Sequence, residues 1–591
     1  MGCATPSLRK YSPSSILLCV LSVVVTFWWS EPLWLTAGQT GGNDWGVMLN
    51  VWEVRWKSLF EYGQWPAFNP WQGGGLPVNP ALGYFSVQAV ATLSLGPKAG
   101  LSVFILCYLL IGLWGFWRLG LLLFASPASA FFLAILGTAS PAFTMHLSVG
   151  HLIYANFMVW PAIIYLLLRA AEDSWSGLKA GILFALGFNE LAYYIMQYGG
   201  MIAAGLWLWR FTQADQPERK ALSRYALLAV AGALPFMIPP FVSIVMIASD
   251  YARIANTPTS FTVSELWQAY FVPDTELKPA VFVPTMQSWW GTWEINCYLG
   301  WGSVLFFGFG LLRGLRWFHV ALVICFIFTI GNLHWWEPMR WLMATPAFAS
   351  LQSFARLRLF TQLFFALGAT WGLALALNDS RWPHLARPAV LLLAGVALAE
   401  ILVVSRRIAS RSHFNFTTPF ITNDCLGEFY QRGTRLGLPA VIDGWPADLV
   451  LYTRANIGIV RESAAIDSSF RQPSRVRTVN DSDYLGEFVQ GTRAVRPVFW
   501  SPNRITFEGL DPTIPLSVNL NRGHPWRNFE RPLFPKDRVV EFDKPFVVQP
   551  DGLGRVDLTY VLPGQRESWW ASGAALMLSV AFAFYLRLGE N

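Results

Sequence analysis

Long apolar runs separated by short polar segments dominate the chain. Runs of roughly 20 apolar residues, the length that crosses a bilayer, lie near residues 15–35, 100–124, 126–145, 152–169, 223–246, 317–333, 359–378, 388–405 and 567–587. A shorter run, 298–312, fits a further crossing, and the stretch from Trp175 to Arg210 fits two short ones with Asn189 and Glu190 at their turn. Together these runs predict a polytopic α-helical membrane protein with about twelve spans.

Composition agrees with this pattern. Of the 591 residues, 54% are hydrophobic and 13% are charged, far from an average soluble domain. The net charge of +7 does not indicate nucleic-acid binding, because lysine and arginine of membrane proteins collect in cytoplasmic loops. Basic segments such as 210–224 are therefore expected in the cytoplasm, and both termini with them. We expect a multi-pass protein of the inner or plasma membrane.

The polar and apolar segments also predict a domain plan. Residues 1–14 form a cytoplasmic head, 15–405 a transmembrane domain with an interfacial first outer loop 36–100, 406–566 an extracytoplasmic domain, and 567–591 a last transmembrane helix with a short tail. The 406–566 segment contains short strand-like runs separated by Gly, Pro, Asn and Asp, which predicts an all-β sandwich or jelly roll. Its strand-like runs are "PAVID", "LVLYT", "RITFEGL", "LSVNL", "RVVEF", "FVVQP" and "VDLTYVL".

No nucleotide-binding loop of the GxxxxGK[ST] or strand-linked GxGxxG type occurs in the sequence. The six cysteines are scattered, without the spacing of a metal site. These observations argue against a cytosolic ATP-driven pump.

An amphipathic helix is predicted from Trp45 onward, with tryptophans on its apolar face and Glu53 and Glu61 on a solvated face. Asp44 stands immediately before this helix. An aspartate there can cap the free N–H groups of the first turn, or it can serve as a catalytic base at the membrane surface. Helix physics alone leaves both roles open.

The segment after this helix reads "GQWPAFNPWQGGGLPVNPALGYF" (63–85) and is rich in Gly, Pro and Asn. Its three successive glycines allow close backbone approach, so it is either a binding edge or a plain cluster of turns. Further characteristic segments are "VGHLIYANFMVWPAIIYLL" (149–167), "EINCYLGWGSVLFFG" (294–308), "PAFASLQSFARLRLF" (346–360), "NRGHPWRNF" (521–529) and "GRVDLTYVLPGQRESWWASG" (554–573). In this order they resemble the YfhO-like branch of the C-type-fold membrane glycosyltransferases, which depend on polyprenyl-phosphate sugars.

The resemblance implies transfer of a sugar, with inversion, from a polyprenyl-phosphate donor to an acceptor glycan, lipid or protein at the extracytoplasmic face. Asp44 coincides with the family's catalytic aspartate. The residues that would bind substrate are His151, Glu190, Tyr194, Glu294, Arg356 and Arg358. The two arginines would bind the phosphate, although the family usually has proline where this chain has Leu357 between them. No cofactor is implied with certainty, and a divalent cation remains an option.

Each of these residues also has a structural reading. The arginines can extend toward the membrane interface, His151 can pack at a helix end, and Glu190 can be a paired buried charge. A lipid or solute transporter, or a non-catalytic assembly scaffold that keeps the fold, remains an alternative. Loss of Asp44 would be tolerated by a scaffold and not by the enzyme.

Overall fold

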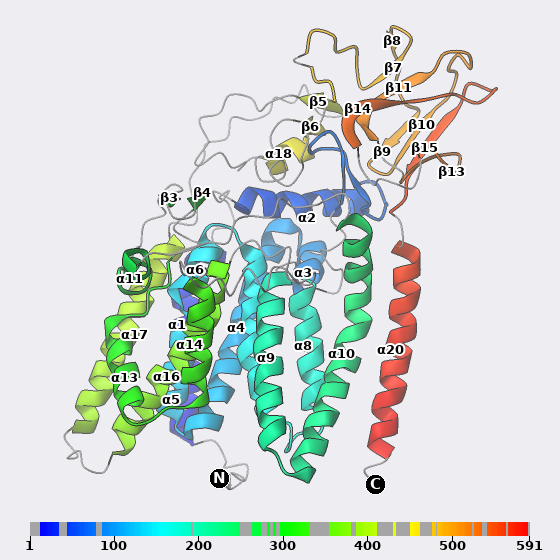
Figure 1. Ribbon diagram of the computed structural model, residues 1–591. Coiled ribbons are helices and arrows are strands. Elements are labelled where there is room, and N and C mark those ends of the chain that lie inside the picture. The colour runs from blue at the N-terminus through cyan, green and yellow to red at the C-terminus, as the bar shows by residue number, and fades with distance from the viewer. Residues whose placement is uncertain are drawn as a thin grey trace.

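The computed structural model describes most of the 591-residue chain. The described residues are 12–34, 44–78, 86–190, 193–248, 263–273, 281–283, 288–290, 296–330, 354–379, 386–410, 429–432, 449–460, 476–479, 481–522, 525–534, 541–562 and 565–588. They form an upright helix bundle, a helix lying across one end of it, and a β-rich region beyond that helix (Figure 1). The end of the bundle next to the β-rich region is named the β end, and the opposite end the far end.

The bundle consists of apolar helices of different lengths. They are α1 (Pro13–Trp34), α4 (Pro97–Phe124), α5 (Pro127–Thr138), α6 (Pro141–Ser148), η1 (Leu152–Val159), α7 (Trp160–Leu168), α8 (Ser176–Phe188), α9 (Tyr193–Gln213), α10 (Gln216–Ala248), α13 (Trp301–Leu312), α14 (Trp317–Ile330), α16 (Arg358–Asn378), α17 (Ala386–Ser410) and α20 (Gln565–Leu588). The shorter helices α3 (Val87–Leu95), α11 (Val263–Phe271) and η3 (Phe354–Leu357) and the strands β3 (Val281–Val283) and β4 (Ser288–Trp290) accompany them.

Six segments in the described part of the chain are long and apolar enough to cross a membrane. They are Pro13–Trp34, Pro97–Phe124, Pro127–Ser148, Gln216–Val242, Arg358–Asn378 and Arg387–Ser410. Shorter apolar segments are Leu152–Leu168, Ser176–Phe188, Trp301–Leu312 and Trp317–Thr329. The prediction of a predominantly helical chain with several membrane-length apolar helices is confirmed, and the count of about twelve spans stays a prediction.

The run predicted as one span over 126–145 consists of two helices, because Pro141 interrupts it. Proline lacks the N–H that a helix interior needs, but it fits the first turn of a new helix. The Ser140 side chain accepts a hydrogen bond from Phe143 N at 3.5 Å and so caps α6. Elsewhere in the bundle, glycine allows two helices to pack closely. A Cβ on Gly372 would lie 1.8 Å from the Phe306 carbonyl oxygen, so only glycine allows this approach of α13 to α16.

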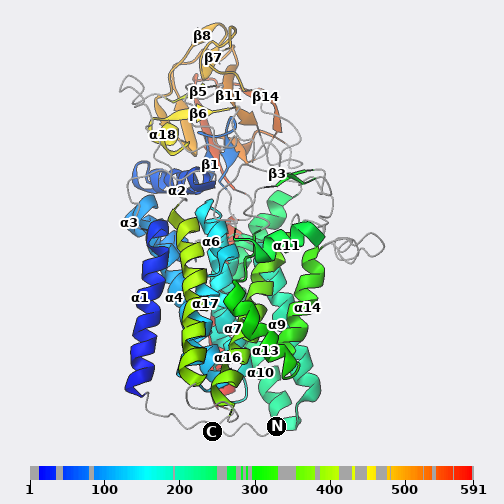
Figure 2. The same ribbon diagram turned by 90° about the vertical axis from the view of Figure 1, so that its left-hand side faces the viewer.

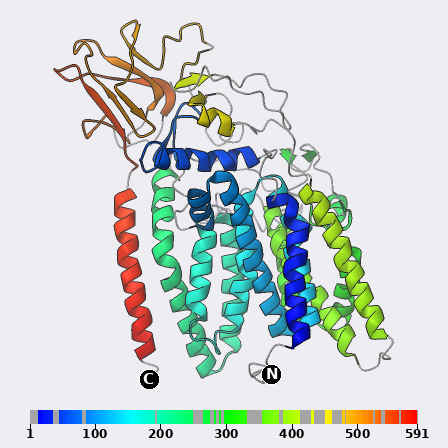
Figure 3. The same cartoon turned by 180° about the vertical axis from the view of Figure 1, so that it is seen from behind.

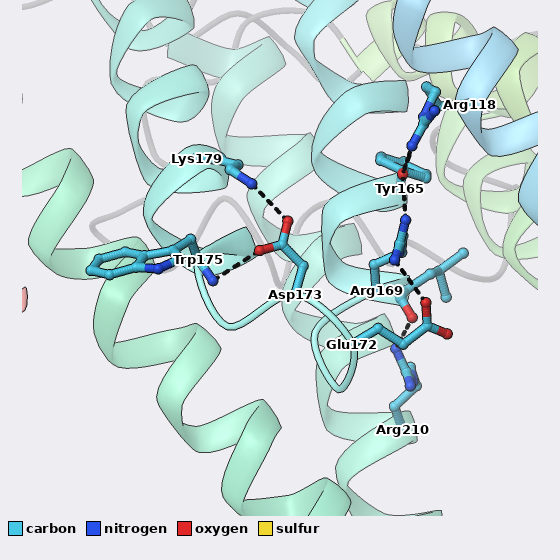
Figure 4. A network of polar contacts seen from close by, with 9 residues as sticks. Arg118, Tyr165, Arg169, Glu172, Asp173, Trp175, Lys179 and Arg210 are labelled. Atoms are coloured by element: carbon cyan, nitrogen blue, oxygen red, sulfur yellow. Dashed lines mark hydrogen bonds and ion pairs between the residues drawn. The ribbon is translucent and has the colours of Figure 1, made fainter. Parts of the chain in front are cut away.

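A network of charged groups joins helices at the far end (Figure 4). The Tyr165 hydroxyl accepts hydrogen bonds from Arg118 Nη2 at 2.7 Å and from Arg169 Nη1 at 3.2 Å. Ion pairs join Arg169 to Glu172 at 2.9 Å, Lys179 to Asp173 at 2.7 Å, and Arg210 to Glu218. These bonds link α4, α7 and α8 to the turn that follows α7, and they join α9 to α10.

Helix α2 (Asp44–Phe60) lies across the β end (Figure 2). The amphipathic helix predicted from Trp45 therefore exists, and Trp45 and Trp52 are buried on it. Its polar side is also covered, by the short helix α18 (Leu449–Arg454). Arg454 donates to both carboxylate oxygens of Glu53 at 2.8 and 2.9 Å.

The prediction of a solvated Glu53 is therefore wrong, since Glu53 is only 3% exposed. Lys57, also buried, donates to the Arg454 carbonyl at 3.0 Å and forms an ion pair with the exposed Glu61 at 3.3 Å. Burial lowers the pKa of Lys57. The pattern of α2 alone could not show this cover, because it comes from a segment some four hundred residues further along the chain.

The β-rich region contains two antiparallel sheets. One has the strand order β13-β12-β15-β10-β9 and the other β14-β11-β7-β8. The strand bounds are β7 (Phe488–Gln490), β8 (Arg493–Ala494), β9 (Phe499–Ser501), β10 (Arg504–Phe507), β11 (Leu516–Arg522), β12 (Trp526–Asn528), β13 (Arg531–Pro532), β14 (Glu541–Val548) and β15 (Val556–Tyr560). Both sheets contribute to one apolar core around the fully buried Trp526, which is the arrangement of a β-sandwich.

The predicted C-terminal β region is thus present, but one of its predicted strands is a helix. The run "LVLYT", read as a strand, lies in the helix α18, beside the parallel pair β5 (Tyr430–Arg432) and β6 (Ile457–Ile459). A short apolar run does not distinguish helix from strand by its periodicity. The run "PAVID" lies outside the described residues.

The glycine-rich first outer loop packs into this β region. The rings of Phe68 in β1 (Phe68–Asn69) and Trp526 pack together with their centroids 5.0 Å apart, and β1 pairs with β2 (Leu76–Pro77). The Asn521 side chain donates to the carbonyl oxygens of Gly73 and Gly75 at 2.7 and 2.8 Å. The glycines therefore hold the sandwich against the bundle and are not an open binding edge.

Helix α20 stands at the edge of the bundle beside α10 (Figure 3). The start of α1 and the end of α20 both lie toward the far end, away from the β region. The serine hydroxyl of Ser572 donates to the Pro235 carbonyl and ties the two helices together.

Candidate functional site

Two histidines meet at the β end, where α6 ends. Gly150 adopts a positive φ of 83°, which reverses the chain after α6. His151 N bonds to His146 O at 3.0 Å and Gly150 N to Leu147 O at 3.0 Å, the two bonds of a Schellman motif. The two imidazole Nδ1 atoms are consequently 3.0 Å apart, so one donates a hydrogen bond and the other accepts it.

Aromatic rings connect this pair to Arg356. The His146 ring stacks on Tyr154 of η1, with centroids 4.4 Å apart. The guanidinium carbon of Arg356 lies 5.4 Å from the Tyr154 ring centroid and 4.6 Å from that of Tyr194 in α9. Contacts of this length between a cation and an aromatic face are favourable. The structure therefore brings the predicted residues Tyr194 and Arg356 together with the turn that contains the predicted His151.

The start of α2 adjoins the same turn. Trp45 Nε1 donates to the carbonyl of Ser148, the last residue of α6, at 3.0 Å. Helix α2 begins at Asp44, the residue expected to precede it. The Asp44 side chain lies outside the described part of the structure, so its capping and catalytic roles both stay predictions.

Glu190 is fully buried between α8 and α9. Its Oε1 accepts hydrogen bonds from the Gln88 backbone N–H at 3.2 Å and from the Tyr108 hydroxyl at 3.1 Å. Since Gln88 lies in the first turn of α3, the carboxylate holds the start of that helix. Tyr194, which contacts Arg356, follows Glu190 by four residues in the sequence.

The two predicted arginines occupy different surroundings. Arg358, the first residue of α16, is buried at 2% exposure, and its carbonyl lies 3.7 Å from the Cys297 sulfur. Arg356 contacts tyrosines of η1 and α9 instead. Glu294, the remaining predicted substrate-binding residue, lies outside the described residues.

Three groups of this region did not stand out in the sequence. His146 and Tyr154 join His151 and Arg356, and the signal for His146 was its place opposite His151 across a glycine turn. Arg55 is fully buried on α2, with its guanidinium carbon 4.7 Å from the Trp52 ring. Its spacing of three residues from Trp52 placed it on the face of the buried tryptophans.

A metal site needs several ligating side chains close together. In the part of the chain that the structure describes, no three His, Cys, Asp or Glu side chains gather in a way that could hold a metal ion. Asp44 and Glu294 contribute nothing to this finding, because their side chains are not described. A requirement for a divalent cation therefore stays untested.

The fold is thus an apolar helix bundle whose β end carries a histidine, tyrosine and arginine cluster next to the start of α2. The chain is similar to the crystal structure of ArnT from Cupriavidus metallidurans bound to undecaprenyl phosphate. The two share 12% sequence identity over 68% of this chain and 77% of that one, with a TM-score of 0.37. No protein-family model matches the sequence, and no curated protein matches it. A likeness of this size establishes neither family nor reaction.

Proposed function

We propose that the protein is a membrane glycosyltransferase of the YfhO-like kind, which moves a sugar from a polyprenyl-phosphate donor to an acceptor glycan, lipid or protein. The observation that carries the proposal is the contact of Arg356 with both Tyr154 and Tyr194, beside the His146–His151 pair. Four segments distant in the sequence supply this cluster and the adjoining start of α2.

The proposed division of labour follows from the chemistry of each group. The Arg356 guanidinium lies against the two tyrosine rings, and the N–H groups of a guanidinium bind phosphate oxygens as a fork. Arg358 would add positive charge behind it. Transfer leaves a phosphate on the carrier, and nearby cations stabilise the negative charge that develops there.

Asp44 is the proposed general base, which takes the proton of the acceptor hydroxyl as the new C–O bond forms. His151 would donate a hydrogen bond to sugar or phosphate, and Tyr194, Glu190 and Glu294 would contact the substrate. The β end is extracytoplasmic in this proposal, since basic side chains such as Arg169, Arg210 and Arg219 gather at the far end.

The proposal is tested with the purified full-length chain in liposomes. A polyprenyl-phosphate-linked radiolabelled hexose is supplied together with a cell-envelope extract as the acceptor source. We expect label to leave the carrier and polyprenyl phosphate to accumulate. Movement of intact donor across the liposome membrane without cleavage would identify a transporter, and no interaction with the donor would favour a scaffold; either result contradicts the proposal.

A further inference from the structure

Two polar side chains at the start of α3 are buried and incompletely hydrogen-bonded. Gln88 and Glu190 are both 0% exposed. Among the residues that the structure describes, neither the Nε2 nor the Oε1 atom of Gln88 has a hydrogen-bond partner, nor does Oε2 of Glu190. The Gln88 backbone N–H lies 3.2 Å from the other oxygen of Glu190, so these atoms belong to one small region.

Such an arrangement is costly for a purely structural element. Burying an amide without hydrogen bonds costs about 1–3 kcal/mol by mutational data. Gln362 shows the usual solution in the same bundle: its Nε2 donates to the Tyr298 carbonyl at 3.0 Å and its Oε1 accepts from Ser140. Two buried glutamines thus differ in that one is paired and the other is open at both polar atoms.

Hydroxyl groups can supply the hydrogen bonds that these atoms lack. The Gln88 amide offers two N–H donors and one acceptor, and Glu190 Oε2 offers an acceptor. A hydroxyl both donates and accepts, so a pair of neighbouring hydroxyls can satisfy the amide and the carboxylate together. Glu190 lies four residues before Tyr194, which contacts Arg356. One of the open atoms therefore belongs to a residue close in sequence to a tyrosine that contacts the proposed phosphate-binding group.

We propose that Gln88 and Glu190 form a subsite that binds hydroxyl groups of the donor's sugar ring, while Arg356 binds its phosphate. This inference rests on the proposed function and names a neutral sugar with adjacent hydroxyls as the substrate class. Glu190 has two tasks here, since one oxygen holds the start of α3 and the other faces the sugar. Gln88 is the specificity-determining residue.

The test compares Gln88→Leu with the matched variant Gln362→Leu in the full-length protein in nanodiscs. Two probes are titrated: a short polyprenyl phosphate alone, and the same carrier bearing glucose, galactose or mannose. We expect wild type to bind at least one hexosyl carrier more tightly than the bare one. Gln88→Leu should lose about five- to tenfold in affinity for that hexosyl carrier, the effect of one or two neutral hydrogen bonds, with unchanged affinity for the bare carrier.

Thermal unfolding without ligand separates this subsite from a structural role. Replacing an unpaired buried amide by leucine removes a desolvation cost, so Gln88→Leu should unfold at or above the wild-type temperature, whereas Gln362→Leu loses two hydrogen bonds and should unfold lower. The subsite is overturned if Gln88→Leu still prefers the hexosyl carrier, if it destabilises as much as Gln362→Leu, or if wild type binds every hexosyl carrier no better than the bare one, as when only water occupies the site. Failure of wild type to bind even the bare carrier would instead contradict the proposed function.

Discussion

The two ends of the helix bundle hold their polar groups differently. At the far end, carboxylates and cations form the ion pairs Arg169–Glu172 and Lys179–Asp173 (Figure 4), together with Arg210–Glu218. At the β end, Arg356 contacts aromatic rings, two imidazoles share a hydrogen bond, and the Gln88 amide has no partner among the described residues. The polar groups at the far end thus form a network within the protein, whereas we propose that a ligand binds at the β end.

This contrast is informative because both ends carry arginines and tyrosines. A surface or interfacial ion pair stabilises a protein by about 1 kcal/mol or less, so the far-end network is a modest brace. Buried polar atoms without partners cost free energy, and a bound molecule is one way of supplying the missing bonds. Substitutions at the β end should therefore alter transfer, and substitutions at the far end should alter stability.

The largest expected effect is that of Asp44→Asn on transfer. Asparagine caps a helix about as well as aspartate, but it cannot accept a proton. Loss of a general base typically lowers the rate about 10²-fold to 10⁴-fold, so transfer should fall at least about a hundredfold with an unchanged unfolding temperature. The far-end variant Asp173→Asn should transfer sugar at the wild-type rate. Persisting activity in Asp44→Asn would make Asp44 a cap only and direct attention to Glu190.

Arg356→Gln should have the next largest effect. It removes a charged hydrogen-bonding fork, which is worth about 1.5–3 kcal/mol, or roughly tenfold to a hundredfold in kcat/KM and in affinity for bare polyprenyl phosphate. Arg356→Lys keeps the charge without the fork and should be intermediate. Arg313→Gln, at an exposed far-end ion pair with Asp379, serves as the control. Equal affinity of all three variants for the carrier would remove Arg356 from the site.

The sequence pattern predicted those helices and strands that are determined by neighbouring residues in the chain. The apolar runs gave the helices, the alternation in "VDLTYVL" gave β15 (Val556–Tyr560), and the tryptophan spacing after Asp44 gave α2. Such patterns reflect the one apolar face that an element must bury.

Features that depend on distant contacts were not predictable in this way. Glu53 is buried because Arg454 covers it, and the Gly73–Gly75 turn is held by Asn521. Of the candidate site residues, His151, Tyr194 and Arg356 lie in or next to one cluster, while Arg358 has different neighbours. Gln88 gave no signal, since a glutamine in an apolar helix gains meaning only from its surroundings.

Tyr165→Phe tests whether the far end contributes to stability alone. The substitution removes the hydroxyl that accepts hydrogen bonds from Arg118 and Arg169. We expect about 1–3 kcal/mol of lost stability, seen as a lower unfolding temperature, with an unchanged transfer rate per folded molecule. Tyr585→Phe, at an exposed tyrosine of α20, should change neither quantity. A large loss of transfer in folded Tyr165→Phe would show that the far end also takes part in the reaction.

The smallest effect concerns a second buried carboxylate, Glu487 in the β region. Unlike Glu190, it is hydrogen-bonded at both oxygens: the Tyr484 hydroxyl donates to Oε1 at 2.7 Å and Asn519 Nδ2 to Oε2 at 3.0 Å. The Gln431 backbone N–H also donates to Oε1, so Glu487 joins β5 to the sandwich. Burial raises its pKa from 4.5 to about 7.

A raised pKa in the folded state means that the folded protein holds a proton which the unfolded chain has released. Stability from Glu487 is therefore fully present below pH 4.5 and is lost as the pH rises through about 7. Hydrogen exchange of β7 and β11, measured against Glu487→Gln at each pH, should show wild type opening progressively more easily between those values. Because glutamine does not titrate, the ratio of the two exchange rates cancels the intrinsic pH dependence. A constant ratio across that range would mean that Glu487 keeps an ordinary pKa, and that complete pairing by Tyr484 and Asn519 offsets the cost of burying its charge.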